Sequence, residues 1–253
     1  MKTNSTKIKL FLTLCLMLTL PLSLLAFAAP EPSIFVCSDG AVKLKYSGGY
    51  TLVNTDQVIW QEVTFTGSTF AATAGVAPVI KTYSGAGTAD LDVNSGTELS
   101  TGAHYWVAHV ISASGAGCTG DVSEPINVYK LPSFSVTVSP TTASFCLDGT
   151  TNLAKPQVTA TVDPAVGTLP TNVVFNYDWT GSTANAGAVN TNVTKFDVTA
   201  TAAADYNVTV KVTYNVTATG KLLKSPGDIP CSSSATAVIK ATNKPAAPTI
   251  TVE

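Results

Sequence analysis

The sequence predicts an all-β protein that consists of two tandem β-sandwich domains behind a secretory signal peptide. Three observations lead to this prediction. Apolar and polar residues alternate over long stretches, which is typical of strands that bury one face. Val and Thr are abundant, and no sustained helical period follows Ala28. One arrangement of Cys and Tyr residues occurs twice at a spacing of about a hundred residues, the length of a small sandwich domain.

Residues 1–28 have the composition of a cleaved signal peptide. Three lysines come first, an apolar run extends from Leu10 to Leu25, and Ala26-Phe-Ala28 forms a small-x-small cleavage site. A retained membrane anchor is the alternative, but the run is shorter than the ~20 residues that a spanning helix needs. We therefore expect cleavage after Ala28, with no membrane span in the mature protein.

Charge composition argues against a nucleic-acid partner. All 14 basic residues are lysines, and charged residues make up only 12% of the chain. Residues 1–28 carry three lysines and no acidic residue, so their removal changes the formal net charge from −2 to −5. Arginine has the planar guanidinium group that binds phosphates and base edges in a bidentate manner. Its absence from a negatively charged chain argues against nucleic-acid binding.

The mature chain contains four cysteines, two of which open a Cys-x-Asp-Gly motif, at Cys37–Gly40 and Cys146–Gly149. Each motif is followed by a strand that begins near a Tyr and then by a second cysteine, Cys118 or Cys231. Four cysteines in a secreted chain predict two disulfides and allow three pairings. The repeat favours Cys37 with Cys118 and Cys146 with Cys231, so that each domain contains one disulfide.

A short motif suggests where the domains begin. Pro, a hydroxyl residue, an apolar residue, a variable residue and Val occur in this order at Pro32–Val36, Pro132–Val136 and Pro248–Val252. The first two copies predict domains at residues 29–131 and 132–244. The third lies in residues 245–253, which we expect to form a C-terminal tail or an orphan strand. This segment can fold back, remain free, or add to the sheet edge of another molecule.

The strand patterns are clearest in the second predicted domain. Val173–Trp179 and Tyr206–Val216 alternate apolar and polar residues without a break. In the first domain, Val42–Tyr46 and Val58–Trp60 show shorter patterns of the same kind. The stretch Tyr105–Val110 is apolar on both faces, so the sequence does not indicate which face is buried.

These features resemble the tandem Ig-like or PKD-like modules of secreted bacterial surface proteins and adhesins. A Trp on an early strand, a Tyr that begins a late strand and a Cys on either side are typical of such modules. The matching residues are Cys37–Gly40, Trp60, Tyr105 and Gly117-Cys118 in the first domain, and Cys146–Gly149, Trp179, Tyr206 and Cys231 in the second. Pro230 replaces the usual Gly, and residues 217–230 lengthen the turn before the last cysteine. The resemblance implies a non-enzymatic protein with no catalytic residues to carry over.

The sequence contains no convincing catalytic, cofactor or metal site. His104 and His109 are five residues apart on one predicted strand, so they point to opposite faces and cannot share a metal ion. Asp90–Gly96 has oxygen ligands at alternate positions, as calcium loops do. However, its Gly comes one position late, and Thr101 stands where Glu closes such a loop. We expect Asp90 and Asp92 to be solvated acids at a strand end.

The expected function is therefore structural or adhesive, in a secreted or cell-surface protein that binds an extracellular protein or a polysaccharide. A carbohydrate-binding accessory protein is the main alternative, with Trp106, Tyr83 and Tyr129 as candidate stacking residues, although core packing is the commoner fate of such side chains. A subunit of a surface polymer joined through its C-terminal strand is a further alternative, and it makes self-association an expected property.

Overall fold

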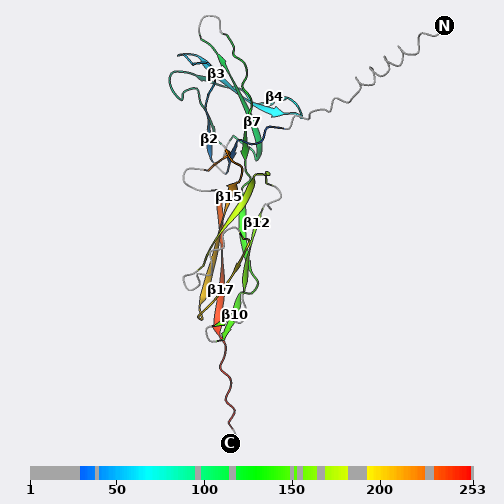
Figure 1. The fold of residues 1–253 in the computed structure, drawn as a ribbon, viewed down its shortest axis with the longest axis vertical. Coiled ribbons are helices and arrows are strands. Elements are labelled where there is room, and N and C mark those ends of the chain that lie inside the picture. Colours follow the sequence, from blue (N-terminus) through cyan, green and yellow to red (C-terminus); the bar gives the residue numbers. More distant parts are fainter. Residues whose placement is uncertain are drawn as a thin grey trace, which may run out of the picture.

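The structure is a computed structural model that describes residues 29–37, 40–94, 98–113, 118–148, 151–152, 156–163, 169–181, 193–225 and 231–251. Within these ranges all regular elements are strands, so the predicted all-β class is confirmed there. The predicted signal peptide lies outside the described residues. Figure 1 shows two lobes stacked end to end, with residues 244–251 extending from the far end of the second lobe.

The first lobe consists of a large sheet and a small one that face each other. Its strands are β1 (Ile34–Val36), β2 (Ala41–Leu44), β3 (Gln57–Phe65), β4 (Phe70–Ala72), β5 (Val79–Thr82), β6 (Leu91–Asn94), β7 (Gly102–Ile111) and β8 (Ile126–Lys130). The large sheet has the order β16-β1-β8-β7-β3-β4, with β5 also paired to β3, and β2 and β6 form the small sheet. The core between them includes Trp60 and Trp106. The face of β7 that carries Trp106, Ala108 and Val110 is therefore the inner one.

The second lobe has the same two-layer construction with a fuller small sheet. Its strands are β9 (Ser135–Pro140), β10 (Ser144–Asp148), β11 (Thr151–Asn152), β12 (Gln157–Asp163), β13 (Val173–Gly181), β14 (Lys195–Asp197), β15 (Asp205–Val216), β16 (Leu222–Lys224) and β17 (Ser232–Asn243). One sheet has the order β11-β10-β17-β15-β13 and the other the order β14-β12-β9. Both predicted long strands, β13 and β15, are confirmed.

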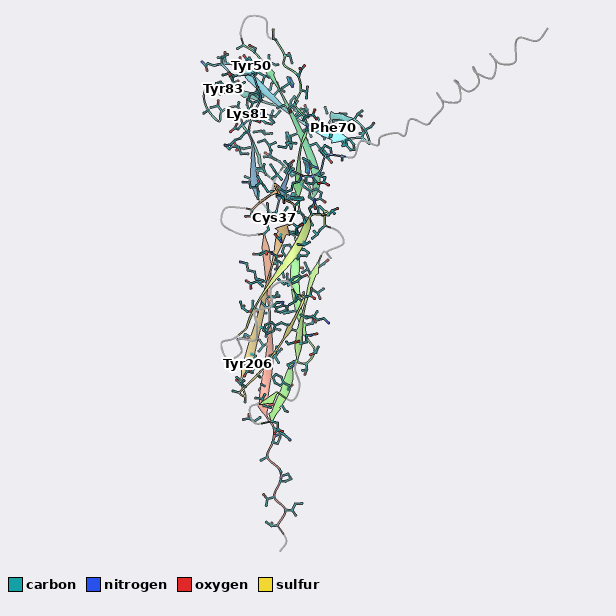
Figure 2. The ribbon with its side chains drawn as sticks, in the orientation of Figure 1. Cys37, Tyr50, Phe70, Lys81, Tyr83 and Tyr206 are labelled. Carbon is teal, nitrogen blue, oxygen red and sulfur yellow. A yellow bond between two sulfur atoms is a disulfide. The ribbon has the colours of Figure 1, made fainter. Side chains whose placement is uncertain are left out.

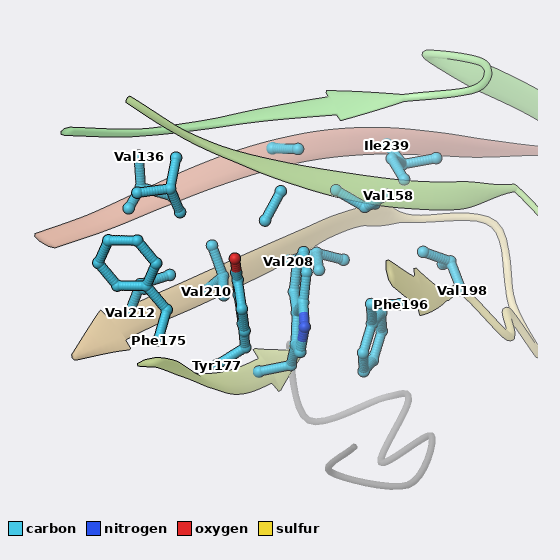
Figure 3. Close-up of a cluster of buried hydrophobic side chains, with 14 of the residues drawn as sticks. Val136, Val158, Phe175, Tyr177, Phe196, Val198, Val208, Val210, Val212 and Ile239 are labelled. Carbon is cyan, nitrogen blue, oxygen red and sulfur yellow. The ribbon is translucent and has the colours of Figure 1, made fainter. Parts of the chain in front are cut away.

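Alternation in β13 and β15 builds the core of the second lobe. Every second residue of β15 from Tyr206 to Tyr214 is buried, because successive side chains of a strand point to opposite faces. Figure 3 shows Phe175, Tyr177 and Val210 pointing between the two sheets, where Val158 of the facing sheet meets them. The strands that the sequence pattern predicts therefore supply the buried aromatic and aliphatic side chains that stabilise this lobe.

Tyr206 also holds the loop that precedes its own strand. The side chain is 1% exposed, and its hydroxyl donates a hydrogen bond of 2.7 Å to the carbonyl oxygen of Ala202. The backbone N–H of Ala202 in turn donates to the same hydroxyl oxygen at 3.3 Å. A buried hydroxyl that is satisfied in this way positions the start of a late strand in many sandwich domains.

The two lobes are joined through β1, which contributes to both cores. Val36 belongs to the core of the first lobe, whereas Phe35 and Cys37 belong to the core of the second. β1 pairs in parallel with β8 on one side and with β16 on the other. β16 comes from the long turn between β15 and β17, so the second lobe supplies the edge strand of the first lobe's large sheet.

The predicted disulfide pairing is wrong. The structure contains a disulfide between Cys37 and Cys231, with a Cα–Cα distance of 5.8 Å, and Cys118 and Cys146 are free and exposed. The turn that carries β16 brings Cys231 to the end of β1, at the joint marked by Cys37 in Figure 2.

The free cysteines lie far from this joint. Cys118 hydrogen-bonds Ser112 beyond the end of β7, and Cys146 pairs with Thr242 near the end of β17. The expectation of one disulfide in each domain is therefore also wrong. The predicted boundaries at 29–131 and 132–244 stay a prediction.

Replacement of Cys231 by Ser should destabilise the whole molecule. The disulfide closes a sequence separation of 194 residues, for which the chain-entropy model gives about 5 kcal/mol of stabilisation. Chemical unfolding of the oxidised protein should show this loss in Cys231→Ser. Cys118→Ser and Cys146→Ser, the matched controls, should unfold like the wild type. Peptide mapping without reductant that found Cys37 joined to Cys118 would contradict the assignment.

Candidate functional site

A cavity of about 640 Å³ opens on the first lobe. Trp106, Ala108 and Val110 of β7 line its inner side, and residues 44–50 and 118–126 contribute its walls. The second wall is held to β7 by hydrogen bonds from Gly120 N–H to the Val110 carbonyl and from Ser123 N–H to the Ala108 carbonyl, both 2.8 Å long. The cavity therefore reaches the core from the side of the sandwich.

The cavity lies where the small sheet ends. β2 and β6 form a two-stranded sheet, whereas the corresponding sheet of the second lobe has three strands. Leu44, at the end of β2, lines the cavity together with Ile126, at the start of β8. The inner face of the large sheet thus borders a cavity at this edge.

Trp106 brings an unsatisfied hydrogen-bond donor to this site. Its side chain is 7% exposed, and its Nε1 is buried without a hydrogen-bond partner among the described residues. The other two tryptophans are satisfied, since Trp60 Nε1 donates to the Ala89 carbonyl at 2.9 Å and Trp179 Nε1 to the Val193 carbonyl at 2.7 Å. A buried donor without a partner is costly, and an acceptor brought by a ligand would relieve that cost.

Asp56 ties the Tyr50 wall of the cavity to the segment that follows β7. Its Oδ2 accepts hydrogen bonds from Val53 N–H at 2.8 Å and from the Tyr50 hydroxyl at 3.0 Å. Its Oδ1 accepts a hydrogen bond of 2.9 Å from Ala113 N–H, which lies on the segment after β7. The backbone donors of Val53 and Ala113 lower the pKa of the Asp56 carboxyl, although its burial acts in the opposite direction. A fully buried carboxylate thus fixes two loops that are distant in sequence.

Tyr50 forms the exposed rim of the cavity. It is 45% exposed, and its hydroxyl also lies 3.4 Å from Ser112 Oγ across the opening. Figure 2 shows Tyr50 at the end of the first lobe that lies away from Cys37. Tyr46 donates a hydrogen bond to the Tyr50 carbonyl at 3.3 Å, and Gly48 approaches the Tyr46 ring so closely that a Cβ would clash there. The loop is therefore shaped by its own tyrosines and glycines.

The charged side chains at the cavity are few and of both signs. Lys45, Asp121 and Glu124 lie on its lining, together with His109. The site combines an apolar inner side with a polar rim, which is the usual composition of a ligand-binding cavity.

The two histidines differ in their surroundings. His104 Nδ1 lies 2.8 Å from Glu62 Oε1, and His104 Nε2 lies 2.8 Å from the Ser100 carbonyl oxygen. His109 contributes to the cavity lining, although it alternates with Ala108 and Val110 along β7. The structure thus does not bring the two rings together, and His104 has a structural role in the contact between β3 and β7.

The acidic residues of the segment Asp90–Gly96 lie at and within strand β6. Asp92 lies on the exposed face of β6 and forms an ion pair of 3.2 Å with Lys43 of β2. Residues 95–97 of this loop lie outside the described residues. Among those that are described, no group of three or more His, Cys, Asp or Glu side chains could hold a metal ion.

Of the three aromatic residues considered for sugar stacking, only Trp106 reaches the cavity. Tyr83 and Tyr129 are partly buried against the two cores. Tyr50 and Asp56 were not predicted from the sequence, because their contact depends on a loop turn and on Ala113, 57 residues further along the chain than Asp56. The sequence signal for this loop is the pair Gly48-Gly49 before Tyr50, which is typical of a turn.

Known structures provide only a distant likeness. No family model and no curated protein matches this chain. The chain is similar in fold to fibronectin(III)-like modules. Those of Clostridium thermocellum CbhA match with 12% identity over 85% of this chain and 92% of theirs, at a TM-score of 0.35. The FN1–FN3 domains of chicken CNTN1 match with 11% identity over 84% of this chain and 65% of theirs, at a TM-score of 0.37. Scores this low assign no residue of this chain a function.

The described segments include no helix that is long and apolar enough to cross a membrane.

Replacement of Asp56 by Asn should loosen the contact between the Tyr50 loop and the segment after β7, and it should change the response of the fold to acid. The pKa of Asp56 is lowered in the folded state, so its contribution to stability is complete above the unfolded value of about 4. That contribution is lost as the pH falls through the lower folded value. The melting temperature of Asp56→Asn should therefore be several degrees below that of the wild type at pH 7, and this gap should close in strong acid.

Asp121→Asn is the matched control, because Asp121 is an exposed acid on the same lining. Its melting temperature should follow that of the wild type at each pH. A gap between wild type and Asp56→Asn that stays constant down to pH 2 would show that the carboxylate does not act through its charge.

Proposed function

We propose that this protein is a non-enzymatic structural or adhesive component of the cell exterior. The observation that carries this proposal is the joint between the lobes. β1 shares its side chains between two cores, and Cys37–Cys231 fixes it covalently to the second lobe. Such a joint resists bending. The cavity, with Tyr50 on its rim, lies toward one end of the molecule, and the exposed tail extends from the other (Figures 1 and 2).

The oxidised joint also supports an extracellular location. Disulfides form and persist outside the cytoplasm, and residues 1–28 have the composition of a secretory signal. The resemblance of the strand and Tyr motifs to Ig-like modules of bacterial surface proteins points in the same direction. In this proposal the lobes act as a rigid scaffold, and loops at their ends contact the partner.

Carbohydrate binding is the second candidate, and Tyr50 favours it. An exposed tyrosine beside an apolar cavity with an unpaired indole N–H offers a stacking face and a donor for a sugar hydroxyl. If this is the function, Tyr50→Ala should weaken retention on an immobilised polysaccharide by up to about tenfold. Tyr50→Phe keeps the ring and should retain most of the binding. Equal retention of all three proteins would exclude the cavity as a sugar site.

The structural function is tested in cells that lack the chain. Such cells should lose adhesion or surface integrity, and secretion of the wild-type chain should restore it. The double variant Cys37→Ser, Cys231→Ser removes the covalent joint and should restore much less at equal secreted amounts. Full restoration by the double variant would show that a fixed joint is not what the function requires.

A further inference from the structure

The small sheet of the first lobe lacks a strand that its counterpart possesses. In the second lobe, β9 pairs antiparallel with β12 and completes a three-stranded sheet with β14. In the first lobe, β2 occupies the position of β12 and pairs with β6 alone. No strand in the described part of the chain pairs with the other edge of β2.

β9 shows what such a strand does for a core. Its first residue, Ser135, pairs with Asp163, the last residue of β12. The edge of β12 is therefore paired up to its C-terminal end. The preceding Phe134 packs on Phe175 and Tyr214 at centroid distances of 4.9 and 4.7 Å, and Val136 is buried. The equivalent place in the first lobe is the end of β2, and the cavity lies there.

The residues that precede β1 do not fill this place. The Asn127 side chain donates a hydrogen bond of 2.7 Å to the Pro30 carbonyl, and Ser33 N–H donates one of 3.0 Å to the Asn127 carbonyl. Asn127 belongs to β8, so the chain enters the first lobe along the large sheet. Among the described residues, β6 alone pairs with β2, and its other edge is unpaired.

A segment with the right pattern is present elsewhere in the chain. Residues 245–251 are exposed and form no strand, and Ile250 is 89% exposed, the highest value among the large apolar side chains of the described residues. Their motif Pro248-Thr-Ile-Thr-Val252 matches Pro132-Ser-Phe-Ser-Val136, which leads into β9. In this correspondence, Ile250 takes the place of Phe134 and Val252 that of Val136.

This segment cannot reach the cavity of its own molecule. β17 runs for 12 residues from Ser232, beside the joint, to Asn243 at the far end of the second lobe, a length of about 40 Å. Residues 245–253 span at most about 32 Å when fully extended. The cavity lies in the first lobe, beyond the joint, so only a second copy can bring its tail there.

We propose that residues 248–252 of one copy add to the free edge of β2 in another copy and supply the strand that the first lobe lacks. Ile250 enters the cavity over Ala108 and Val110, and a backbone carbonyl of the added strand accepts the hydrogen bond that Trp106 Nε1 does not otherwise make. Because donor and acceptor are at opposite ends of the molecule, repetition gives a head-to-tail filament. This inference rests on the proposed structural function and names its partner as a second copy.

Sedimentation velocity across a range of concentrations tests the proposal. Residues 29–253 should form a concentration-dependent series of oligomers, because a strand this short gives a small and reversible interface. Residues 29–244 should remain monomeric, and their fold should be intact because the removed segment contacts no core. Ile250→Asp should weaken association at least tenfold. Thr249→Asp places the same charge on the outward face and should change it less than threefold.

A cross-link identifies the acceptor. Cys118 is exposed on the cavity lining, and the side chain at position 250 enters that cavity, so Ile250→Cys in a Cys146→Ser background should give an oxidised ladder of copies on a gel. Cys118→Ser should remove the ladder. Oligomers that form without this cross-link would place the contact elsewhere and overturn the proposal. So would a full chain that stays monomeric, or one that binds a polysaccharide in the cavity without assembling.

The cell assay with residues 29–244 separates the filament hypothesis from the proposed structural function. Restoration by a chain that cannot assemble would refute the filament and leave the structural function standing. Loss of restoration by residues 29–244 and by Ile250→Asp, with normal restoration by Thr249→Asp, would support both.

Discussion

The architecture depends on the three residues Phe35-Val36-Cys37, which divide their side chains between two cores. In an extended chain, neighbouring side chains point to opposite sides, so Val36 packs in the first lobe while its neighbours pack in the second. The parallel pairing with β8 and β16 satisfies the backbone on both edges of this strand. The first lobe therefore cannot lose β1 without exposing apolar surface of the second, and the stabilities of the two lobes are coupled through one short segment.

The same strand explains the open side of the first lobe. The described residues before β1 run along β8 and do not cover the end of β2, and the apolar side of β7 borders a cavity there. Asp56 then fixes the Tyr50 wall of the cavity to the segment after β7 through three hydrogen bonds. The pairing of β1 with β8 thus accounts for both the joint between the lobes and the position of the cavity.

The strands were predictable from the sequence because their signal is local. The alternation in β13 and β15 directly specifies which side chains are buried. The disulfide was not predictable in this way. The repeat suggested two independent domains, whereas β16 crosses the joint and brings Cys231 to Cys37. The Asp56 site was missed for a related reason, since Ala113 is remote in sequence. Long-range register is set by packing, and a single sequence carries little trace of it.

The Cys37–Cys231 bond also sets how the molecule responds to mechanical tension. A pull applied between Ala29 and the C-terminal tail passes from residues 29–37 across the sulfur atoms into β17, and from there out of the molecule. The enclosed residues, 38–230, lie outside that path, so stretching cannot unravel them while the bond is intact. The molecule therefore transmits such a pull through β17 with little extension, and a reductant releases residues 38–230 and makes the tether several times longer.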